Sequence, residues 1–411
     1  MADAHSTAQA RRRIAIDALG SQLSSDPGSA AVRLAAMLDQ QRPMFVSADI
    51  DGLVSAAMLA SVAPGFEIVA FSVQSSQWLV HPSVVSHVPD DMFGVDLFSV
   101  RHDNVSNHVV TWGRKQIKIP EVRQAFELWD TEVATAASQR LLAVPAIWAN
   151  TEGGYESGGV AYSATYKYPL GTAQVLLAML EAAGRGPKFY DRTYLPWLVA
   201  NCDGGIDSYT RYANNARVWW PVMAGAVGPG SMTEQIFRMV DTMRPHDFLD
   251  AVHRLDRERP PSSDRWLNDK WNLVNGSPKV IKDTLTWLAE LTGWRDPVRG
   301  GTADLGQWQM LHVQDSAQVY YTSTAPNAAA LAANPTWVKA KEDPVRAAGL
   351  ITGALTALNA NFYFGREPGS RFNWVGGWAT NRPVVAVPPA GAVAPPTAVV
   401  PTADPPQLTL P

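Results

Sequence analysis

The sequence has very little cysteine: Cys202 is its single cysteine among 411 residues. That excludes an intramolecular disulfide and any zinc site built from several cysteines, and it fits a reducing compartment. Also missing is a run of about 20 uncharged apolar residues, the length that a membrane-spanning helix needs. Residues 1–13 are basic, but no apolar segment of signal-peptide length follows them. We therefore expect a soluble, cytoplasmic protein with no membrane partner.

A strong net charge is missing as well. Lys and Arg number 34 against 38 Asp and Glu, which leaves a formal net charge of −4. No global basic field therefore favours nucleic acid, and any contact with it would need a local patch. No Gly-x-Gly-x-x-Gly string follows the first predicted strand, which makes a Rossmann-type dinucleotide binder a weak hypothesis.

Tryptophan, in contrast, is abundant, at 15 residues. Large aromatic side chains usually fill cores and interfaces, although some could stack on nucleic-acid bases. We favour packing and leave a self-interface through a Trp-rich surface open. The clusters are Trp219-Trp220, Trp266 with Trp271, and Trp374 with Trp378.

The order of strand and helix patterns predicts an α/β protein with a doubly wound, mainly parallel sheet. The chain is longer than a typical single domain, so we expect a second, smaller folded unit and a tail. The predicted strands are 44–47, 67–73 and 92–98 in the main unit and 307–313 and 318–322 in the smaller one, and the predicted helices include 121–142, 173–183 and 344–361. The predicted organisation is a helical lead-in (1–43), the main α/β domain (44–225), a helical connector (226–300), a small α+β domain (301–382) and a Pro/Ala-rich extended tail (383–411).

The most informative segment is Ser47-Ala48-Asp49-Ile50-Asp51-Gly52, which joins the first predicted strand to a helix. On an extended strand end, Asp49 and Asp51 point to the same side and can share a divalent cation. Gly52 permits a tight turn, and the helix N-terminus after it suits a bound phosphate. The alternative is that the aspartates only cap the helix.

Further candidate ligands follow at later strand ends. Asp96 ends the third predicted strand, Asp203 follows an apolar segment, and His108 could add an imidazole supported by Asp103 or Asn107. The carboxyl ends of parallel strands share one edge of the sheet, where ligands bind. Such a set could hold two Mn²⁺ or Mg²⁺ ions, which generate a hydroxide for attack on phosphorus. The alternative for His108, and for His102, is a surface loop histidine.

These segments resemble the DHH phosphoesterase superfamily, which includes RecJ-type exonucleases, short-oligonucleotide phosphodiesterases, cyclic-dinucleotide phosphodiesterases and family II pyrophosphatases. The likeness covers about residues 40 to 210 and rests on four strings: Ser47 to Gly52, Gly94-Val95-Asp96-Leu97, Tyr168 to Ala173, and Leu198 to Gly204. It implies a DHH-like fold with Asp49, Asp51 and His108 as catalytic residues. The metal ligands it implies are Asp49, Asp51, Asp96, His108 and Asp203.

The chain departs from the family pattern in three places. Ser47 stands where the family has a metal-binding histidine, and no Asp-His-His triplet occurs; Ser106-Asn107-His108 is the nearest string. That string follows Asp96 too closely for the helix and strand that the family places between them. The family's C-terminal Gly-Gly-Gly-His signature is reduced to Gly376-Gly377 without the histidine.

The C-terminal unit supplies the candidate substrate-binding residues. Arg366 and Arg371 precede Gly376 and Gly377 and could hold a phosphate bidentately; ordinary surface arginines are the alternative. We predict a metal-dependent phosphodiesterase or nuclease that acts on nucleotides or short single-stranded oligonucleotides. The alternative is a catalytically inactive DHH-like protein with a binding, sensing or assembly role, in which a protein partner docks on the tail or a Trp-rich surface.

Overall fold

The computed structural model describes residues 17, 19–73, 77–107, 118–145, 147–148, 170–188, 198–200, 202, 213–242, 244, 277–320, 328–363 and 371–379. Among these residues, no helix combines the length and the apolar character needed to cross a membrane.

The main sheet has seven strands in the order β6-β5-β4-β1-β2-β3-β7. Five neighbouring strands, β6, β5, β4, β1 and β2, are parallel to one another. At one edge of the sheet, β3 is antiparallel to both of its neighbours, β2 and β7. The α/β class with a mainly parallel sheet is therefore confirmed. The strands are β1 (Arg42–Ser47), β2 (Phe66–Val73), β3 (Gln77–Val80), β4 (Phe93–Val95), β5 (Asp103–Val105), β6 (Leu142–Ala143) and β7 (Gln309–His312).

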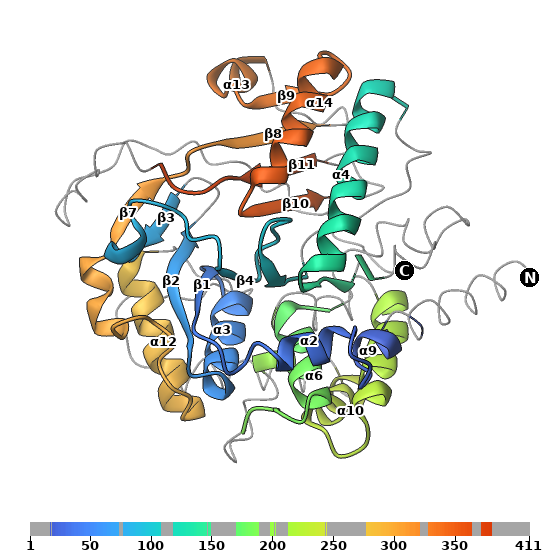
Figure 1. The fold of residues 1–411 in the computed structure, drawn as a ribbon, viewed down its shortest axis with the longest axis vertical. Helices are drawn as coiled ribbons and strands as arrows, with labels where there is room; N and C mark the ends of the chain where they lie inside the picture. The colour runs from blue at the N-terminus through green and yellow to red at the C-terminus, as the bar shows by residue number, and fades with distance from the viewer. Residues whose placement is uncertain are drawn as a thin grey trace, which may run out of the picture.

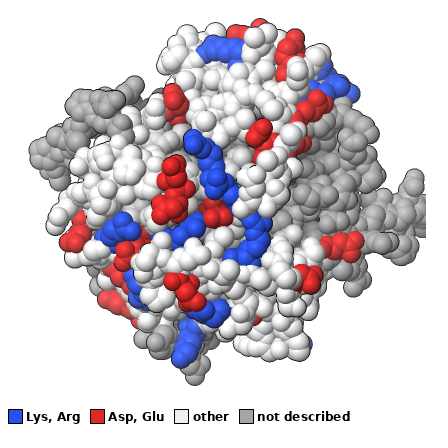
Figure 2. Space-filling model, in the orientation of Figure 1, with Lys and Arg blue, Asp and Glu red and all other residues white. Residues whose placement is uncertain are grey.

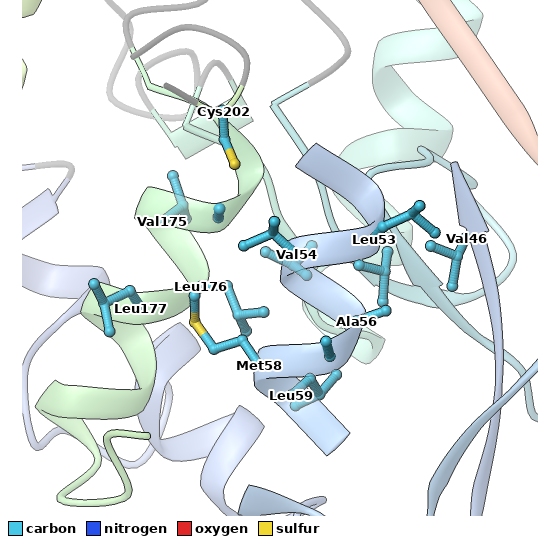
Figure 3. Close-up of a cluster of buried hydrophobic side chains, with 14 of the residues drawn as sticks. Val46, Leu53, Val54, Ala56, Met58, Leu59, Val175, Leu176, Leu177 and Cys202 are labelled. Atoms are coloured by element: carbon cyan, nitrogen blue, oxygen red, sulfur yellow. The ribbon is translucent and has the colours of Figure 1, made fainter. Parts of the chain in front are cut away.

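The central strands are short apolar runs because both faces of the sheet are covered. Phe45 and Val46 of β1 and all of β4 are buried, as expected for parallel strands between helical layers. Helix α3 (Ile50–Val62) packs beside α6 (Thr172–Ala182). In Figure 3, Val54 and Met58 of α3 point toward α6, whereas Leu53 points toward Val46 of β1.

Other helices surround this core. The predicted helix over 121–142 is confirmed as α4 (Pro120–Gln139), and the predicted connector contains α10 (Met232–Thr242) and α12 (Pro278–Thr292). Before the connector, α2 (Ala30–Ala35) precedes β1 and α9 (Ala213–Val227) precedes α10. A 3₁₀ turn, η2 (Pro82–Val84), lies between β3 and β4.

A second sheet has four strands in the order β10-β11-β8-β9. It is mixed, because β8 and β9 are parallel and the other pairs antiparallel. Figure 1 shows it above the main sheet, with α4 running alongside. Its strands and helices are β8 (Ser316–Tyr320), α13 (Ala328–Ala333), β9 (Trp337–Lys339), α14 (Pro344–Gly353), η6 (Ala354–Thr356), β10 (Asn359–Tyr363) and β11 (Arg371–Val375).

Aromatic packing joins α4 to this second sheet. Phe126 and Trp129 of α4 make edge-on contacts with Phe372 of β11, at ring-centroid distances of 5.7 and 6.0 Å. The prediction that tryptophan serves packing is confirmed for the residues whose side chains the structure describes as fully buried: Trp78, Trp129, Trp219, Trp220 and Trp378.

The predicted boundary of the small domain at residue 301 does not separate the two sheets. Although β7 lies within the predicted small domain (301–382), it is the edge strand of the main sheet and pairs with β3. The turn η5 (Thr302–Gln307) precedes it. Trp78 of β3 donates its indole N–H to the Gly376 carbonyl at 3.0 Å, and Trp378 donates to the Val84 carbonyl at 3.0 Å. The C-terminal residues therefore help to close the main core.

One predicted helix is too long. The Ala/Leu pattern predicts a helix over 344–361, but α14 ends at Gly353 and the chain enters β10 at Asn359. A Cβ on Gly353 would lie 2.9 Å from the Trp374 ring, and Ala360 donates its N–H to the Phe98 carbonyl at 2.9 Å. Pairing with β11 and with the main domain therefore overrides the local helical preference.

Candidate functional site

The candidate site lies where the winding of the main sheet reverses. The chain passes from β1 through α3 to β2 on one side, whereas β4, β5 and β6 lie on the other. The reversal therefore falls between β1 and β4, and ligands of open α/β sheets bind at the carboxyl ends of such strands. Asp49 and Asp51 follow β1, Asp96 follows β4, and Asn107 follows β5.

Asp49 caps helix α3. Its carboxylate accepts the Gly52 N–H at 2.9 Å, and the Ser47 hydroxyl donates to it at 2.6 Å. Asp49 therefore does cap the helix, and a second role remains open to it because each carboxylate oxygen has two lone pairs. Ser47, at the position of the family's histidine, supports this cap.

Gly52 is required by close packing. A Cβ at this position would lie 2.3 Å from the Ser47 carbonyl oxygen, inside any allowed contact. The first turn of α3 therefore approaches the end of β1 so closely that only glycine fits.

Asp51 is fully buried and anchors another helix. Its carboxylate accepts the backbone N–H groups of Thr172 and Ala173, each at 2.8 Å. These are orphan N–H groups of the first turn of α6, where negative charge is favoured. Asp51 thus ties the end of β1 to the N-terminus of a helix more than a hundred residues later.

Asp96 meets the same helix. It is fully buried, with a positive φ of 57° that aspartate tolerates better than most residues. The Thr172 hydroxyl donates to its carboxylate, and that hydroxyl also accepts the Asn107 N–H at 2.9 Å. Thr172 therefore brings β1, β4 and the end of β5 together at one point.

Sequence reasoning missed the role of Thr172. The only signal was its position in Gly171-Thr172-Ala173, at the start of an apolar helix. Nothing in that pattern identifies which carboxylates will face the helix end, because both come from distant segments.

The segment that carries Asp203 begins beside α6. The Gln174 side chain donates to the carbonyl of Cys202 at 3.3 Å and also to that of Val199. Cys202 is buried, and Figure 3 shows it near Val175 of α6. Asp203 itself lies outside the described residues, as do His108 and Arg366; their assignments stay predictions.

One neighbouring residue, His102, corrects the sequence analysis. His102 is buried with 5% exposure and its ring packs edge-on against Phe45 at 5.3 Å, so the surface-loop alternative is wrong for it. Burial lowers the pKa of His102 to about 4, assisted by the charges of Arg101 and Arg140. Asp103 starts β5 and pairs with Arg42 at 2.5 Å; because His108 lies outside the described residues, its support by Asp103 stays a prediction.

The connection from β4 to β5 is short. Residues 96–102 link these parallel neighbours without a helix, and Asp96 donates its N–H to the Val105 carbonyl at 2.9 Å. The segment between Asp96 and Ser106 is too short for a helix and a strand, and it contains the strand β5 alone. Asp96 and Ser106-Asn107 consequently lie at the ends of neighbouring strands.

The predicted substrate residues of the C-terminal unit have structural partners. Arg371 lies opposite Tyr320 in the small sheet; burial raises the pKa of the Tyr320 hydroxyl, which the charge and hydrogen bond of Arg371 oppose. The Gly376 N–H donates to the Asp315 carbonyl at 2.7 Å, and the Gly377 carbonyl accepts from Gln314 at 2.7 Å. Substrate binding by these residues stays a prediction.

No protein-family model matches this chain, and no curated protein or solved structure matches it.

The candidate metal ligands of the site are only partly described by the structure. Within the described part of the chain, no group of three or more His, Cys, Asp and Glu side chains is arranged to hold a metal ion. Asp49, Asp51 and Asp96 therefore do not form such a group by themselves, and His108 and Asp203 lie outside the described residues. The donors that are described are oxygen atoms, which Mg²⁺ and Mn²⁺ prefer.

Proposed function

We propose that this chain is a metal-dependent phosphoester hydrolase with a DHH-like fold, acting on nucleotides or short single-stranded oligonucleotides. The observation that carries the proposal is the convergence of Asp51 and Asp96 on Thr172. These two carboxylates follow neighbouring strands at the reversal of the sheet and are both fully buried. Ligands of open α/β folds bind at this position.

The strand order supports the DHH-like assignment. The resemblance implies an Asp-x-Asp-Gly string after the first strand and an aspartate after a later strand, with a helix and a strand between that aspartate and the third motif; in this chain a strand alone lies between them. Asp49 and Asp51 follow β1, Asp96 follows β4, and Ser106-Asn107 follows β5, the next strand of the sheet.

Electrostatics favours a cation here. Asp51 and Asp96 both contact Thr172, so two buried carboxylates are neighbours, and like charges in a low dielectric repel unless a proton or cation intervenes. When bound, Mg²⁺ or Mn²⁺ supplies a hydroxide nucleophile and stabilises charge at phosphorus. The α6 N-terminus holds the Asp51 carboxylate in place, and the Ser47 hydroxyl orients Asp49.

The surface charge favours a small substrate. On the face drawn in Figure 2, Lys and Arg side chains lie among Asp and Glu side chains and form no broad single-sign area. A long polyanion needs a continuous basic track. With a net charge of −4, a nucleotide or short oligonucleotide is the better match.

The test uses substitutions that keep the fold. Asp51→Ala is unsuitable because it would leave two N–H groups of α6 without an acceptor. Asp49→Asn keeps a good helix cap, and Asp96→Asn keeps an acceptor for Thr172 and tolerates positive φ. With Mn²⁺ and a short oligonucleotide as substrate, each substitution should reduce the rate of nucleotide release at least about 100-fold. The reason is that losing a residue that only hydrogen-bonds to a metal ligand already lowers activity about 10- to 100-fold.

Matched controls keep the result interpretable. Asp39→Asn removes an exposed carboxylate on the surface and should leave turnover unchanged. Asp49→Asn and Asp96→Asn should both unfold at the denaturant midpoint of the native chain, within the small shift that a surface substitution usually causes. Turnover that survives in Asp49→Asn and Asp96→Asn would contradict the proposal.

A second candidate is a catalytically inactive DHH-like protein that binds a nucleotide or a partner. The observation that favours it is that residues of the site already have structural roles. Ser47 stands at the position of the family's histidine and bonds to Asp49, Asp49 caps α3, and Asp51 caps α6. Elemental analysis of the purified protein separates the candidates. Two bound divalent ions per chain favour the hydrolase, and none favours the inactive protein.

A further inference from the structure

Asn107 has an unusual environment at the candidate site. It follows β5 and is 5% exposed, and its main-chain N–H donates to the Thr172 hydroxyl at 2.9 Å. Neither its side-chain Nδ2 nor its Oδ1 has a hydrogen-bond partner among the described residues. The main chain of Asn107 is therefore one hydrogen bond from Thr172, the residue that contacts Asp51 and Asp96, whereas the polar atoms of its side chain have no partner among the described residues.

An unused buried carboxamide is unfavourable in the free protein. Burying a polar group without a partner costs its full desolvation penalty. Native proteins keep few such groups, and each calls for an explanation such as a ligand that completes the bonding. At the edge of the sheet where ligands bind, a ligand is the explanation that the position favours.

Asn104 shows what a structural asparagine looks like in the same strand. It is fully buried, and its Nδ2 donates to the carbonyls of Ser99 and His102, each at 2.8 Å. Those bonds hold the short connection between β4 and β5. Its Oδ1 has no partner in the described part of the chain, but its amide nitrogen has two carbonyl partners, whereas the Asn107 amide nitrogen has none there.

We infer that Asn107 is the phosphate-binding residue of this site. Resting on the proposed function, the inference assigns its Nδ2 as a donor to a phosphoryl oxygen and its Oδ1 as an acceptor for a water molecule beside that group. Asp49, Asp51 and Asp96 attract cations but repel a phosphoryl group, so the site needs an uncharged or cationic donor. The Asn107 carboxamide is such a donor at this edge, and the substrate group it takes is a phosphate monoester or diester.

The experiment compares Asn107→Leu with Asn104→Leu. Leucine keeps the branched shape of asparagine, with the same number of side-chain non-hydrogen atoms, and removes both polar atoms. In the absence of ligand, Asn107→Leu should melt at or above the native temperature because the unpaired amide is removed. Asn104→Leu should melt lower because two carbonyls lose their donor.

Binding is then measured with inorganic phosphate and Mg²⁺ by calorimetry and by the shift in melting temperature. The native chain should bind phosphate, and Asn107→Leu should bind it at least about 10-fold more weakly, the effect of losing one hydrogen bond to a charged group. Asn107→Asp, which puts a carboxylate beside the phosphate, should lose the phosphate response while Mg²⁺ alone still raises the melting temperature.

The outcomes separate the two proposals. If the native chain binds phosphate and Asn107→Leu binds it equally well, the role of Asn107 is overturned and the proposed function stands. A ligand-free Asn107→Leu variant that melts as low as Asn104→Leu, or fails to fold, also overturns it by showing a structural role. A native chain that binds neither Mg²⁺ nor phosphate overturns the proposed function and this inference together.

Discussion

Asp49 and Asp51 stand two residues apart, yet the structure gives them different partners. Asp49 is half-buried and caps its own helix, whereas Asp51 is fully buried and accepts N–H groups from α6. Their shared spacing predicted one common ligand. That common ligand stays a prediction; the hydrogen bonds add that the fold depends more on Asp51 than on Asp49.

At the scale of single residues, His102 should make stability depend on pH. Its pKa in the folded protein is about 4, below the unfolded value of about 6.5. The unfolded chain therefore binds the extra proton, and this contribution to stability is complete above about pH 6.5 and is lost as the pH falls toward 4. The loss is on the order of 3 kcal/mol. Urea unfolding between pH 7.5 and about 4 measures it.

His102→Gln should remove this pH-dependent component, so the stability difference between the native chain and the variant should shrink on acidification. His87→Gln changes an exposed histidine and should follow the native curve. Parallel curves for the native chain and His102→Gln would show that His102 does not titrate as its burial implies.

Gly52 offers a second test at this scale. Gly52→Ala forces a Cβ to 2.3 Å from the Ser47 carbonyl and should cost about 1–3 kcal/mol through strain at the end of β1. Gly349→Ala in α14, where nothing lies within 4 Å of a new Cβ, should instead gain about 0.5–1 kcal/mol from helix propensity. Denaturant midpoints compare the two; an equal response to both substitutions would contradict the packing argument.

Among the elements, α6 organises the site because Asp51, which follows β1, and Asp96, which follows β4, both accept hydrogen bonds from Thr172 at its N-terminus. Thr172→Val keeps the shape of the side chain but removes the hydroxyl that donates to Asp96 and accepts from Asn107. With two buried groups left without this partner, the variant should lose at least about 2 kcal/mol. Chemical denaturation measures the loss.

Thr172→Ser separates the hydroxyl from the methyl group. It keeps both hydrogen bonds and removes one buried methyl, so it should cost about 1 kcal/mol. Should Thr172→Ser prove as unstable as Thr172→Val, packing of the methyl rather than bonding of the hydroxyl would dominate at the start of α6.

For the whole molecule, the antiparallel edge makes the chain interdependent. β3 pairs with β7 on one side and β2 on the other, and Trp78 of β3 bonds to the Gly376 carbonyl. A chain ending at residue 300 should therefore expose the edge of β3, unfold without a cooperative transition and aggregate. A chain ending at residue 382 keeps every described residue and should melt like the full chain. Calorimetry and size-exclusion chromatography check both, and cooperative melting of the shorter chain would contradict the prediction.

Local chemistry made part of this architecture predictable. The apolar run before Asp49, the cap at Asp49 and the close turn at Gly52 lie within a few residues of one another, so their pattern is visible without the fold. The same holds for α4, whose apolar positions recur with the helical period. The short connection after Asp96 was not predicted, because strand pairing and not local preference determines where β5 begins.

The amino-acid order alone determined that a buried strand leads to Asp49, Asp51 and a helix, since propensity, capping and glycine sterics act over short distances along the chain. Only the tertiary structure decided that Asp51 and Asp96 meet at Thr172, that β7 completes the main sheet, and that the Asn107 carboxamide finds no partner among the residues the structure describes. The physical reason is that buried carboxylates and sheet edges are satisfied by whichever distant groups folding brings to them. Those partners are set by packing of the whole chain.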